Sequence, residues 1–162
     1  MQGFHKKDIR SDEFACSKAG LIRLFAEDEA AMLKIGRQLG RQLQPGDVVC
    51  LYGCLGAGKT TLAKAIASSL DIPEREITSA SFTIIAEHYG RLPFYHVDLY
   101  RLEDGGVEGI GVEECFDHDG ITVIEWPERG ESIIPEERIN VRINIEQAGR
   151  TLEIESLKPL SF

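Results

Sequence analysis

An eight-residue glycine-rich segment, Gly53-Cys54-Leu55-Gly56-Ala57-Gly58-Lys59-Thr60, constrains the fold of this chain more than any other feature. It satisfies the pattern G-x-x-x-x-G-K-[ST] at every position. A continuous apolar run, Val48–Tyr52, precedes it, as is typical of a strand buried on both faces of a parallel sheet. Apolar residues at helical spacing follow, so we expect a helix over residues 59–70. This order of strand, glycine loop and helix predicts a loop that cradles phosphate groups.

The residue types in this segment suit phosphate binding. Glycines let the backbone wrap closely around phosphate oxygens, and successive N–H groups then point inward as an anion-binding nest. We expect the Lys59 ammonium to reach the β- and γ-phosphates and the Thr60 hydroxyl to ligate Mg²⁺. Thr61 either supports the α-phosphate or simply starts the helix. The predicted nucleotide-binding residues of the segment are Gly53, Gly56, Ala57, Gly58, Lys59, Thr60 and Thr61.

Two acidic residues, Glu125 and Asp98, end apolar runs further along the chain. In open α/β sheets, ligands bind beyond the carboxyl ends of the strands. Glu125 ends such a run, a layout in which the carboxylate holds Mg²⁺ or acts as base for a water. Asp98 faces the same phosphates only if its strand runs parallel to residues 48–52, and the sequence leaves that direction open. The candidate catalytic residues are Lys59, Asp98 and Glu125, and the candidate Mg²⁺ ligands are Thr60, Asp98 and Glu125.

Five other residues are weaker candidates. Ser81 and Thr83 belong to a hydroxyl-rich segment between the expected phosphate-loop helix and the next strand, which suits a switch that senses the γ-phosphate. Trp126 lies either on the nucleotide face or in the core. Arg101 either stabilises phosphate charge or forms a structural ion pair. His96 alternates onto the same strand face as Asp98, and we favour a structural role for it.

The remaining periodicity predicts one α/β domain over residues 20–162, after a flexible leader at residues 1–19. Residues 29–43 are expected to form an amphipathic helix, and residues 103–116 a loop and helix interrupted by glycines. Strands are expected at residues 21–25, 82–88, 92–98, 121–124, 138–145 and 151–157. We therefore predict a three-layer domain like those of P-loop NTPases, with a mixed, largely parallel central sheet and a C-terminal antiparallel hairpin.

Composition and charge limit the partners and the cellular compartment that we expect for this chain. The net charge is −9, and residues 82–162 alone carry 7 basic and 17 acidic groups, which argues against nonspecific nucleic-acid binding. The spacing of the four cysteines matches no zinc or disulfide framework, so free thiols are expected. No apolar run approaches the length of a membrane span, and residues 1–8 lack the apolar region of a signal peptide. We therefore expect a cytoplasmic protein without membrane contact. We also expect it to be monomeric in isolation.

Four motifs in order resemble the TsaE (YjeE) family of small bacterial P-loop ATPases. They are Leu51-Tyr52-Gly53 with the segment from Leu55 to Leu62, the segment from Ser79 to Thr83, His96-Val97-Asp98-Leu99-Tyr100-Arg101, and Glu125-Trp126-Pro127. The resemblance implies a Mg²⁺-dependent ATPase that supports threonylcarbamoyladenosine modification of tRNA beside the anticodon. It further implies action on a TsaB–TsaD complex, with tRNA contacted only indirectly. Trp126 would belong to the conserved face beside the nucleotide, and Ser81 and Thr83 to the switch-like segment.

The chain departs from the family pattern at two positions. Cys54 stands where the family usually has aspartate, and Ala80 stands where it usually has proline. We expect these changes to alter nucleotide affinity or switching, because one removes a charge near the phosphates and the other loosens the backbone. Cys54 also precedes a helix N-terminus, a position that favours reactive thiols.

Two other readings of the phosphate loop stay open on the sequence. One is a small-molecule kinase, although the segment after Ile110 is acidic where such kinases usually carry an arginine-rich lid. The other is a nucleotide-responsive binding module with negligible hydrolysis. A GTPase is disfavoured because no N-K-x-D guanine-reading motif is present.

Overall fold

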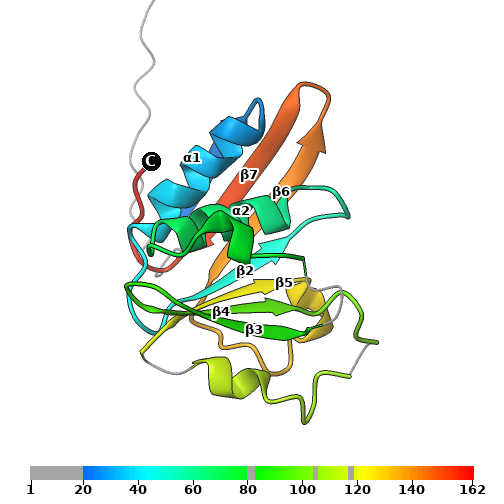
Figure 1. Cartoon of the computed structure of the whole chain (residues 1–162). Helices are drawn as coiled ribbons and strands as arrows, with labels where there is room; N and C mark the ends of the chain where they lie inside the picture. The colour runs from blue at the N-terminus through cyan, green and yellow to red at the C-terminus, as the bar shows by residue number, and fades with distance from the viewer. Residues whose placement is uncertain (1–19, 80–82, 104–105, 117–118) are drawn as a thin grey trace, which may run out of the picture.

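The computed structural model describes residues 20–79, 83–103, 106–116 and 119–162, which form a seven-stranded sheet with helices on its faces (Figure 1). The predictions for residues 1–19 therefore lie outside the described part of the chain. In chain order the elements are β1 (Gly20–Ala26), α1 (Glu29–Gly40), β2 (Val48–Tyr52), α2 (Lys59–Ser68), η1 (Glu74–Glu76), β3 (Ile85–Tyr89), β4 (Pro93–Asp98), η2 (Val112–Phe116), β5 (Ile121–Glu125), η3 (Pro127–Arg129), β6 (Ile139–Glu146) and β7 (Gly149–Ser156).

The strand order is β1-β7-β6-β2-β5-β4-β3. The four central strands β6, β2, β5 and β4 run parallel, whereas β1, β7 and β3 are antiparallel to their neighbours. This confirms the predicted mixed sheet with a largely parallel centre and a C-terminal hairpin. It also settles the direction of β4, so the carboxyl ends of β2, β4 and β5 meet at one edge of the sheet.

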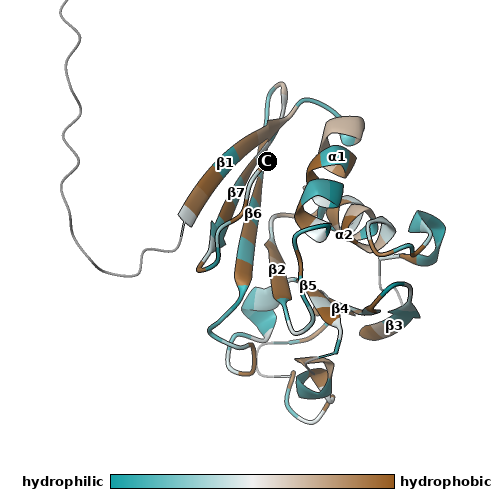
Figure 2. Ribbon diagram, turned by 90° about the vertical axis from the view of Figure 1, so that its left-hand side faces the viewer, coloured by the Kyte–Doolittle hydropathy of each residue, from teal (hydrophilic) through white to brown (hydrophobic). Residues whose placement is uncertain are grey.

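The helices α1 and α2 pack against each other on one face of the sheet (Figure 2). The α1 helix begins after Asp28, whose side chain accepts a hydrogen bond from the Ala31 N–H at 2.8 Å. The two helices approach closely at Gly36, because a Cβ there would lie 2.5 Å from the Cβ of Ala65. This packing holds α2, and therefore the loop in front of it, firmly against the sheet.

The opposite face is covered by loops and short 3₁₀ helices. A second apolar cluster lies there, built on Val48, Cys50 and Ile124 of the sheet and on Val112 and Cys115 of η2. The third layer is thus made of 3₁₀ turns, and the helix predicted within residues 103–116 is confined to η2. Within the described residues, no helix is both long enough and apolar enough to cross a membrane.

The two predicted α-helices end earlier than expected. α1 stops at Gly40 where residues up to 43 were predicted, and α2 stops at Ser68 where residues up to 70 were predicted. After α2, Asp71 adopts a left-handed conformation with φ of 65°, and the N–H of Ile72 returns to the carbonyl of Ala67. This is the hydrogen-bonding of a Schellman turn, which ends a helix while satisfying its last carbonyl groups.

Candidate functional site

Both candidate acids lie at the carboxyl edge of the parallel strands. Asp98 ends β4 and Glu125 ends β5, and the two residues are partners in the β4–β5 register. Glu125 is also paired with Leu51 of β2, directly before the glycine loop. The two side chains are almost fully buried, with 8% and 3% of their surfaces exposed. The sheet thus brings both carboxylates beside the phosphate-binding loop, as the sequence predicted for Glu125 and left conditional for Asp98.

The glycine loop needs glycine for reasons visible in its backbone. Gly56 and Gly58 have φ values of 79° and 109°, in the left-handed region that side chains disfavour. Gly53 approaches the β6 strand so closely that a Cβ would lie 2.9 Å from the carbonyl oxygen of Ile143. Gly58 is the N-cap of α2, so the loop leads directly into a helix N-terminus, which favours anions.

Lys59 is buried under the loop that it follows. Its ammonium donates hydrogen bonds to the carbonyl oxygens of Gly53 at 2.6 Å and Cys54 at 2.9 Å. The Nζ atom also lies 3.9 Å from the centre of the Trp126 ring, a cation–π contact. Burial lowers the pKa of Lys59, and the negative charge of Glu125 opposes that shift. The sequence placed Lys59 in the site, and the structure surrounds it with loop carbonyls, a ring and nearby carboxylates.

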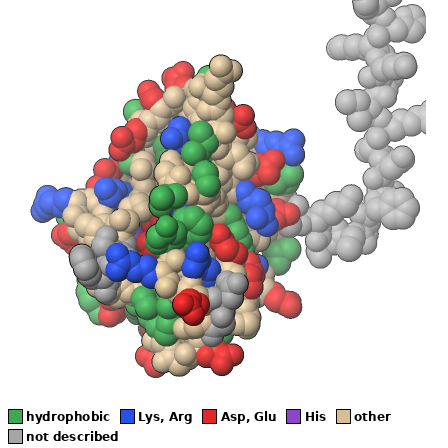
Figure 3. Space-filling view, turned by 90° about the vertical axis from the view of Figure 1, so that its right-hand side faces the viewer, with side chains coloured by type: hydrophobic (Ala, Val, Ile, Leu, Met, Phe, Trp, Pro, Cys, Tyr) green, Lys and Arg blue, Asp and Glu red, His purple; other side chains and the backbone are tan. Residues whose placement is uncertain are grey.

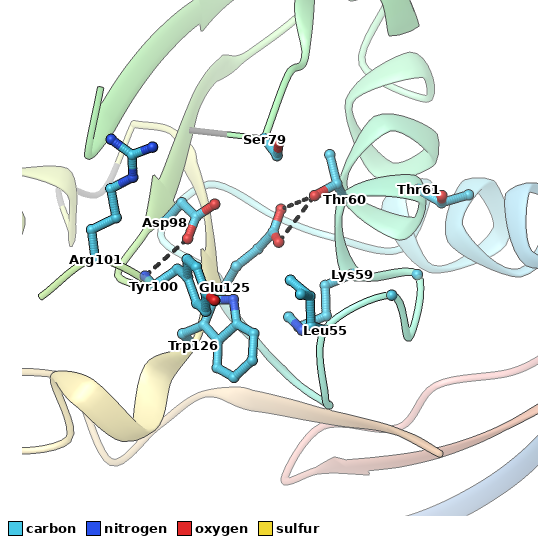
Figure 4. A pocket seen from close by; sticks show the side chains of 12 residues that line it. Leu55, Lys59, Thr60, Thr61, Ser79, Asp98, Tyr100, Arg101, Glu125 and Trp126 are labelled. Atoms are coloured by element: carbon cyan, nitrogen blue, oxygen red, sulfur yellow. Dashed lines mark hydrogen bonds between the residues drawn. The ribbon is translucent and has the colours of Figure 1, made fainter. Parts of the chain in front are cut away.

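Glu125 lies at the centre of a hydrogen-bonded group. The Thr60 hydroxyl donates to its carboxylate, with distances of 2.9 and 3.1 Å to the two oxygens. The Nε2 atom of His96 lies 2.8 Å from Glu125 Oε1. An ionised Glu125 accepts hydrogen bonds from both partners, which requires the Nε2–H form of His96. His96 is itself almost fully buried, and this hydrogen bond connects it to the candidate acid. Figure 4 shows the Glu125 carboxylate beside the Thr60 hydroxyl, with Asp98 and Lys59 nearby.

Trp126 forms one wall of the site. Its backbone is left-handed, with φ of 58°, a strained conformation for a bulky side chain. Its ring lies 4.9 Å from the ring of Tyr100 at an angle of 42°, and the Arg129 guanidinium lies 5.6 Å from the Tyr100 ring. The indole therefore packs on the second apolar cluster and also faces Lys59. The sequence left open whether Trp126 lies in the core or on the face of the phosphate loop, and its ring contacts both.

A cleft of about 400 Å³ unites these groups. Among the predicted residues it is lined by Gly56, Gly58, Lys59, Thr60, Thr61, Asp98, Arg101, Glu125 and Trp126, and it also includes Leu55, Ser79 and Tyr100. Figure 3 views the molecule from this side and shows hydrophobic side chains gathered at the middle of the face, with basic and acidic ones beside them.

The remaining predicted residues do not line the cleft with their side chains. Gly53 and Ala57 enter the site through the loop backbone. Ser81 lies outside the described residues, and Thr83 is exposed and is not among the described residues that line the cleft. Leu55 and Tyr100 are the lining residues that sequence reasoning missed. Leu55 occupies a variable position of the loop motif, and Tyr100 follows the end of β4, so no periodicity singles them out.

The oxygen donors near Thr60 suit a hard cation. The Thr60 hydroxyl and the carboxylates of Asp98 and Glu125 are the ligand types that Mg²⁺ prefers. Within the described part of the chain, no group of three or more His, Cys, Asp and Glu side chains is placed to form a metal cage. Mg²⁺ is usually held by one or two carboxylates together with substrate phosphates and water.

Comparison with known proteins assigns the family. The family model described as "Threonylcarbamoyl adenosine biosynthesis protein TsaE" matches residues 26–152. The TsaE protein of Treponema pallidum is 45% identical over 113 residues, covering 68% of this chain and 82% of the relative. The Haemophilus influenzae TsaE protein is 34% identical over 138 residues, covering 80% of this chain and 86% of the relative.

A solved structure supports the same assignment. The crystal structure of YdiB from Bacillus subtilis superimposes with a TM-score of 0.71 at 31% identity, covering 86% of this chain and 88% of that one. The resemblance inferred from the four sequence motifs is therefore confirmed. This chain belongs to the TsaE family, whose members take part in the biosynthesis of threonylcarbamoyladenosine in tRNA.

Proposed function

We propose that this chain is a Mg²⁺-dependent ATPase that supports threonylcarbamoyladenosine modification of tRNA by acting on the TsaB–TsaD complex. The observation that carries the proposal is the buried Glu125 carboxylate, which is hydrogen-bonded to Thr60 beside the phosphate-loop lysine. A glycine loop alone is sufficient to bind a nucleotide. A carboxylate held in this position is what hydrolysis requires in addition.

The residues divide into binding and chemical roles. The loop N–H groups and the Lys59 ammonium bind the β- and γ-phosphates of ATP, and Thr61 lies on the α-phosphate side. Thr60, Glu125 and Asp98 would hold Mg²⁺, which supplies positive charge opposite the phosphate oxygens. Arg101 lines the same cleft and adds a further positive charge near it.

Hydrolysis requires water to attack the γ-phosphorus as the bond to the β–γ bridging oxygen breaks, which releases ADP and phosphate. The attacking water must lose a proton. Glu125 and Asp98 are the carboxylates lining the cleft that can accept it. The Nε2 atom of His96 lies 2.8 Å from Glu125 Oε1. This hydrogen bond fixes the orientation of the carboxylate before the substrate arrives.

The charge distribution supports an indirect relation to tRNA. The second half of the chain is strongly acidic, which is unfavourable for holding a polyanion directly. A protein partner that itself binds tRNA removes this conflict. The TsaB–TsaD complex is the partner that membership of the TsaE family suggests.

The first prediction concerns ATP hydrolysis by the purified chain. We expect slow MgATP turnover by the chain alone and a higher rate when TsaB and TsaD from the same genome are added. Lys59→Ala should lower either rate by about 100-fold or more, because the ammonium stabilises charge on the transferred phosphoryl group. Phosphate release under steady-state conditions measures both effects.

Either of two outcomes would overturn the proposal. One is unchanged, negligible turnover in the presence of a TsaB–TsaD pair shown to be active, which would favour a nucleotide-responsive binding module. The other is a Lys59→Ala variant that hydrolyses ATP at the parental rate, because the activity would then come from another site or a contaminant. Arg23→Met, on the outer strand β1, provides a control that loses the same charge away from the cleft.

The second prediction concerns Cys54, whose thiol is exposed on the loop. Burial raises the pKa of Cys50 to about 12 and that of Cys115 to about 11, so these thiols are unreactive at neutral pH. In a Cys16→Ser background, a maleimide should therefore label Cys54 first. The adduct should weaken MgATP binding at least about tenfold, equivalent to about 1.4 kcal/mol, because it lies on the phosphate-binding loop.

Equilibrium titration of labelled and unlabelled protein with a fluorescent ATP analogue measures this effect. Cys54→Ser treated with the same reagent serves as the control and should keep its affinity. Full labelling at Cys54 with unchanged MgATP affinity would show that the outer side of the loop does not contribute to binding.

A further inference from the structure

Arg150 contacts the phosphate-binding loop from the far end of the chain. It lies at the start of β7, where its Nε atom donates to the carbonyl oxygen of Ala57 at 3.1 Å and an Nη2 atom donates to that of Gly56 at 3.4 Å. The same side chain lines a second cavity of about 210 Å³, which borders the loop at Gly56 and Gly58. Neither the glycine motif nor the acidic candidates indicated this contact.

The backbone of Arg150 is fixed on both sides by the sheet. It pairs with Ala26 of β1 and with Ile145 of β6, so β7 delivers the guanidinium from within a continuous ladder. The loop has the opposite character, because Gly56 and Gly58 have no side chains that would restrict their left-handed backbone. The strand β7 is rigid and, through Arg150, restrains the glycine loop. This restraint reduces the conformational entropy that the loop loses when it binds a ligand.

The two hydrogen bonds determine where the loop N–H groups point. In a trans peptide the C=O and the following N–H point in opposite directions, and no peptide among the described residues is cis. Because the Ala57 carbonyl is directed at Arg150, the N–H of Gly58 is directed away from it. The Gly56 carbonyl similarly orients the N–H of Ala57, which donates to the Cys54 carbonyl at 3.1 Å and closes the turn of the loop.

The guanidinium also acts through its charge. A cationic donor polarises the peptide whose carbonyl it holds, which increases the partial positive charge on the N–H at the other side. The effect is local to the Gly56–Ala57 and Ala57–Gly58 peptides, and it adds to the charge of the α2 N-terminus. Both the orientation and the polarity of the loop therefore favour anions when Arg150 is in place.

We propose that Arg150 is a positioning residue for phosphate binding, which aligns the peptides of Gly56 and Ala57 from outside the loop. This inference rests on the proposed function, since it assigns the hairpin a part in binding the nucleotide phosphates. It also gives the C-terminal hairpin a role in the site beyond completing the sheet. The Arg150 guanidinium acts through the loop backbone and need not touch the nucleotide.

The test compares Arg150→Met and Arg150→Lys with the parent chain in titrations with MgATP and with inorganic tripolyphosphate. We expect Arg150→Met to weaken both ligands by a similar factor of about tenfold, because both use the same loop N–H groups. Arg150→Lys keeps the charge but lacks the planar fork, so it should recover part of the loss. Arg23→Met is the matched control, because it also removes one arginine from the β1–β7 region and should bind both ligands normally.

Thermal unfolding without ligand separates positioning from folding. The variants should retain the melting temperature of the Arg23→Met control while losing affinity. MgATP binding by Arg150→Met within twofold of the parent would overturn the inference. Weakened MgATP with unchanged tripolyphosphate binding would also overturn it, because Arg150 would then act on the nucleoside. If the parent chain binds neither ligand, the proposed function fails, and the inference fails with it.

Discussion

Replacing Glu125 with glutamine is expected to lower MgATP turnover by about 10²–10⁴-fold, the range for loss of a positioned acid–base group. The substitution removes the charge and keeps the shape. Glu125 Oε1 accepts from both Thr60 at 2.9 Å and His96 at 2.8 Å, and the amide oxygen of glutamine can occupy the same place. Folding and the position of the α2 helix should therefore be preserved, while proton acceptance is lost and the charge that attracts Mg²⁺ is removed.

Single-turnover hydrolysis and equilibrium MgATP titration separate the two effects. The affinity of Glu125→Gln should stay within about threefold of the parent, because the loop and Lys59 carry most of the phosphate binding. Glu155→Gln, an identical change at an exposed position of β7, should leave both quantities unaltered. A Glu125→Gln variant that turns over at the parental rate would remove this residue from the mechanism.

Local patterns predicted the elements of this fold well, because each depends on residues close in sequence. The strand, glycine loop and helix around Lys59 were recognisable, and so was the hairpin that pairs β6 with β7. The ends of the helices were less predictable. The turn that follows α2 contains a left-handed Asp71, a conformation that aspartate tolerates but that its presence in a sequence does not predict.

Long-range pairing explains what the sequence could not settle. The direction of β4 depends on its register with β5, and this pairing alone decides whether Asp98 faces the phosphate loop or the opposite edge. The contact of Arg150 with Ala57 similarly joins residues 93 positions apart. The bond between His96 and Glu125 crosses two neighbouring strands, so the strand alternation that placed His96 near Asp98 could not identify its partner.

The prediction for Asp98 follows from this placement. Asp98→Asn should also lower MgATP turnover by about 100-fold or more, because it removes a buried negative charge from the cleft that also holds the proposed metal ligands Thr60 and Glu125. The change is otherwise mild. Asp98 Oδ1 accepts a hydrogen bond from the Tyr100 N–H at 3.0 Å, and the oxygen of asparagine can accept the same bond. A fold that survives this substitution allows the loss of rate to be assigned to chemistry.

A magnesium titration of Asp98→Asn distinguishes the two roles that a carboxylate can have here. If Asp98 mainly binds Mg²⁺, more Mg²⁺ is needed for half-maximal turnover and saturating Mg²⁺ restores much of the rate. If Asp98 mainly accepts the proton, the maximal rate stays low at every Mg²⁺ concentration. Asp119→Asn is the control, because Asp119 is exposed just before β5, at the opposite end of this strand from Glu125. Parental turnover by Asp98→Asn would leave Glu125 as the carboxylate on which hydrolysis depends, and the pairing of the two acids would then be a feature of the sheet alone.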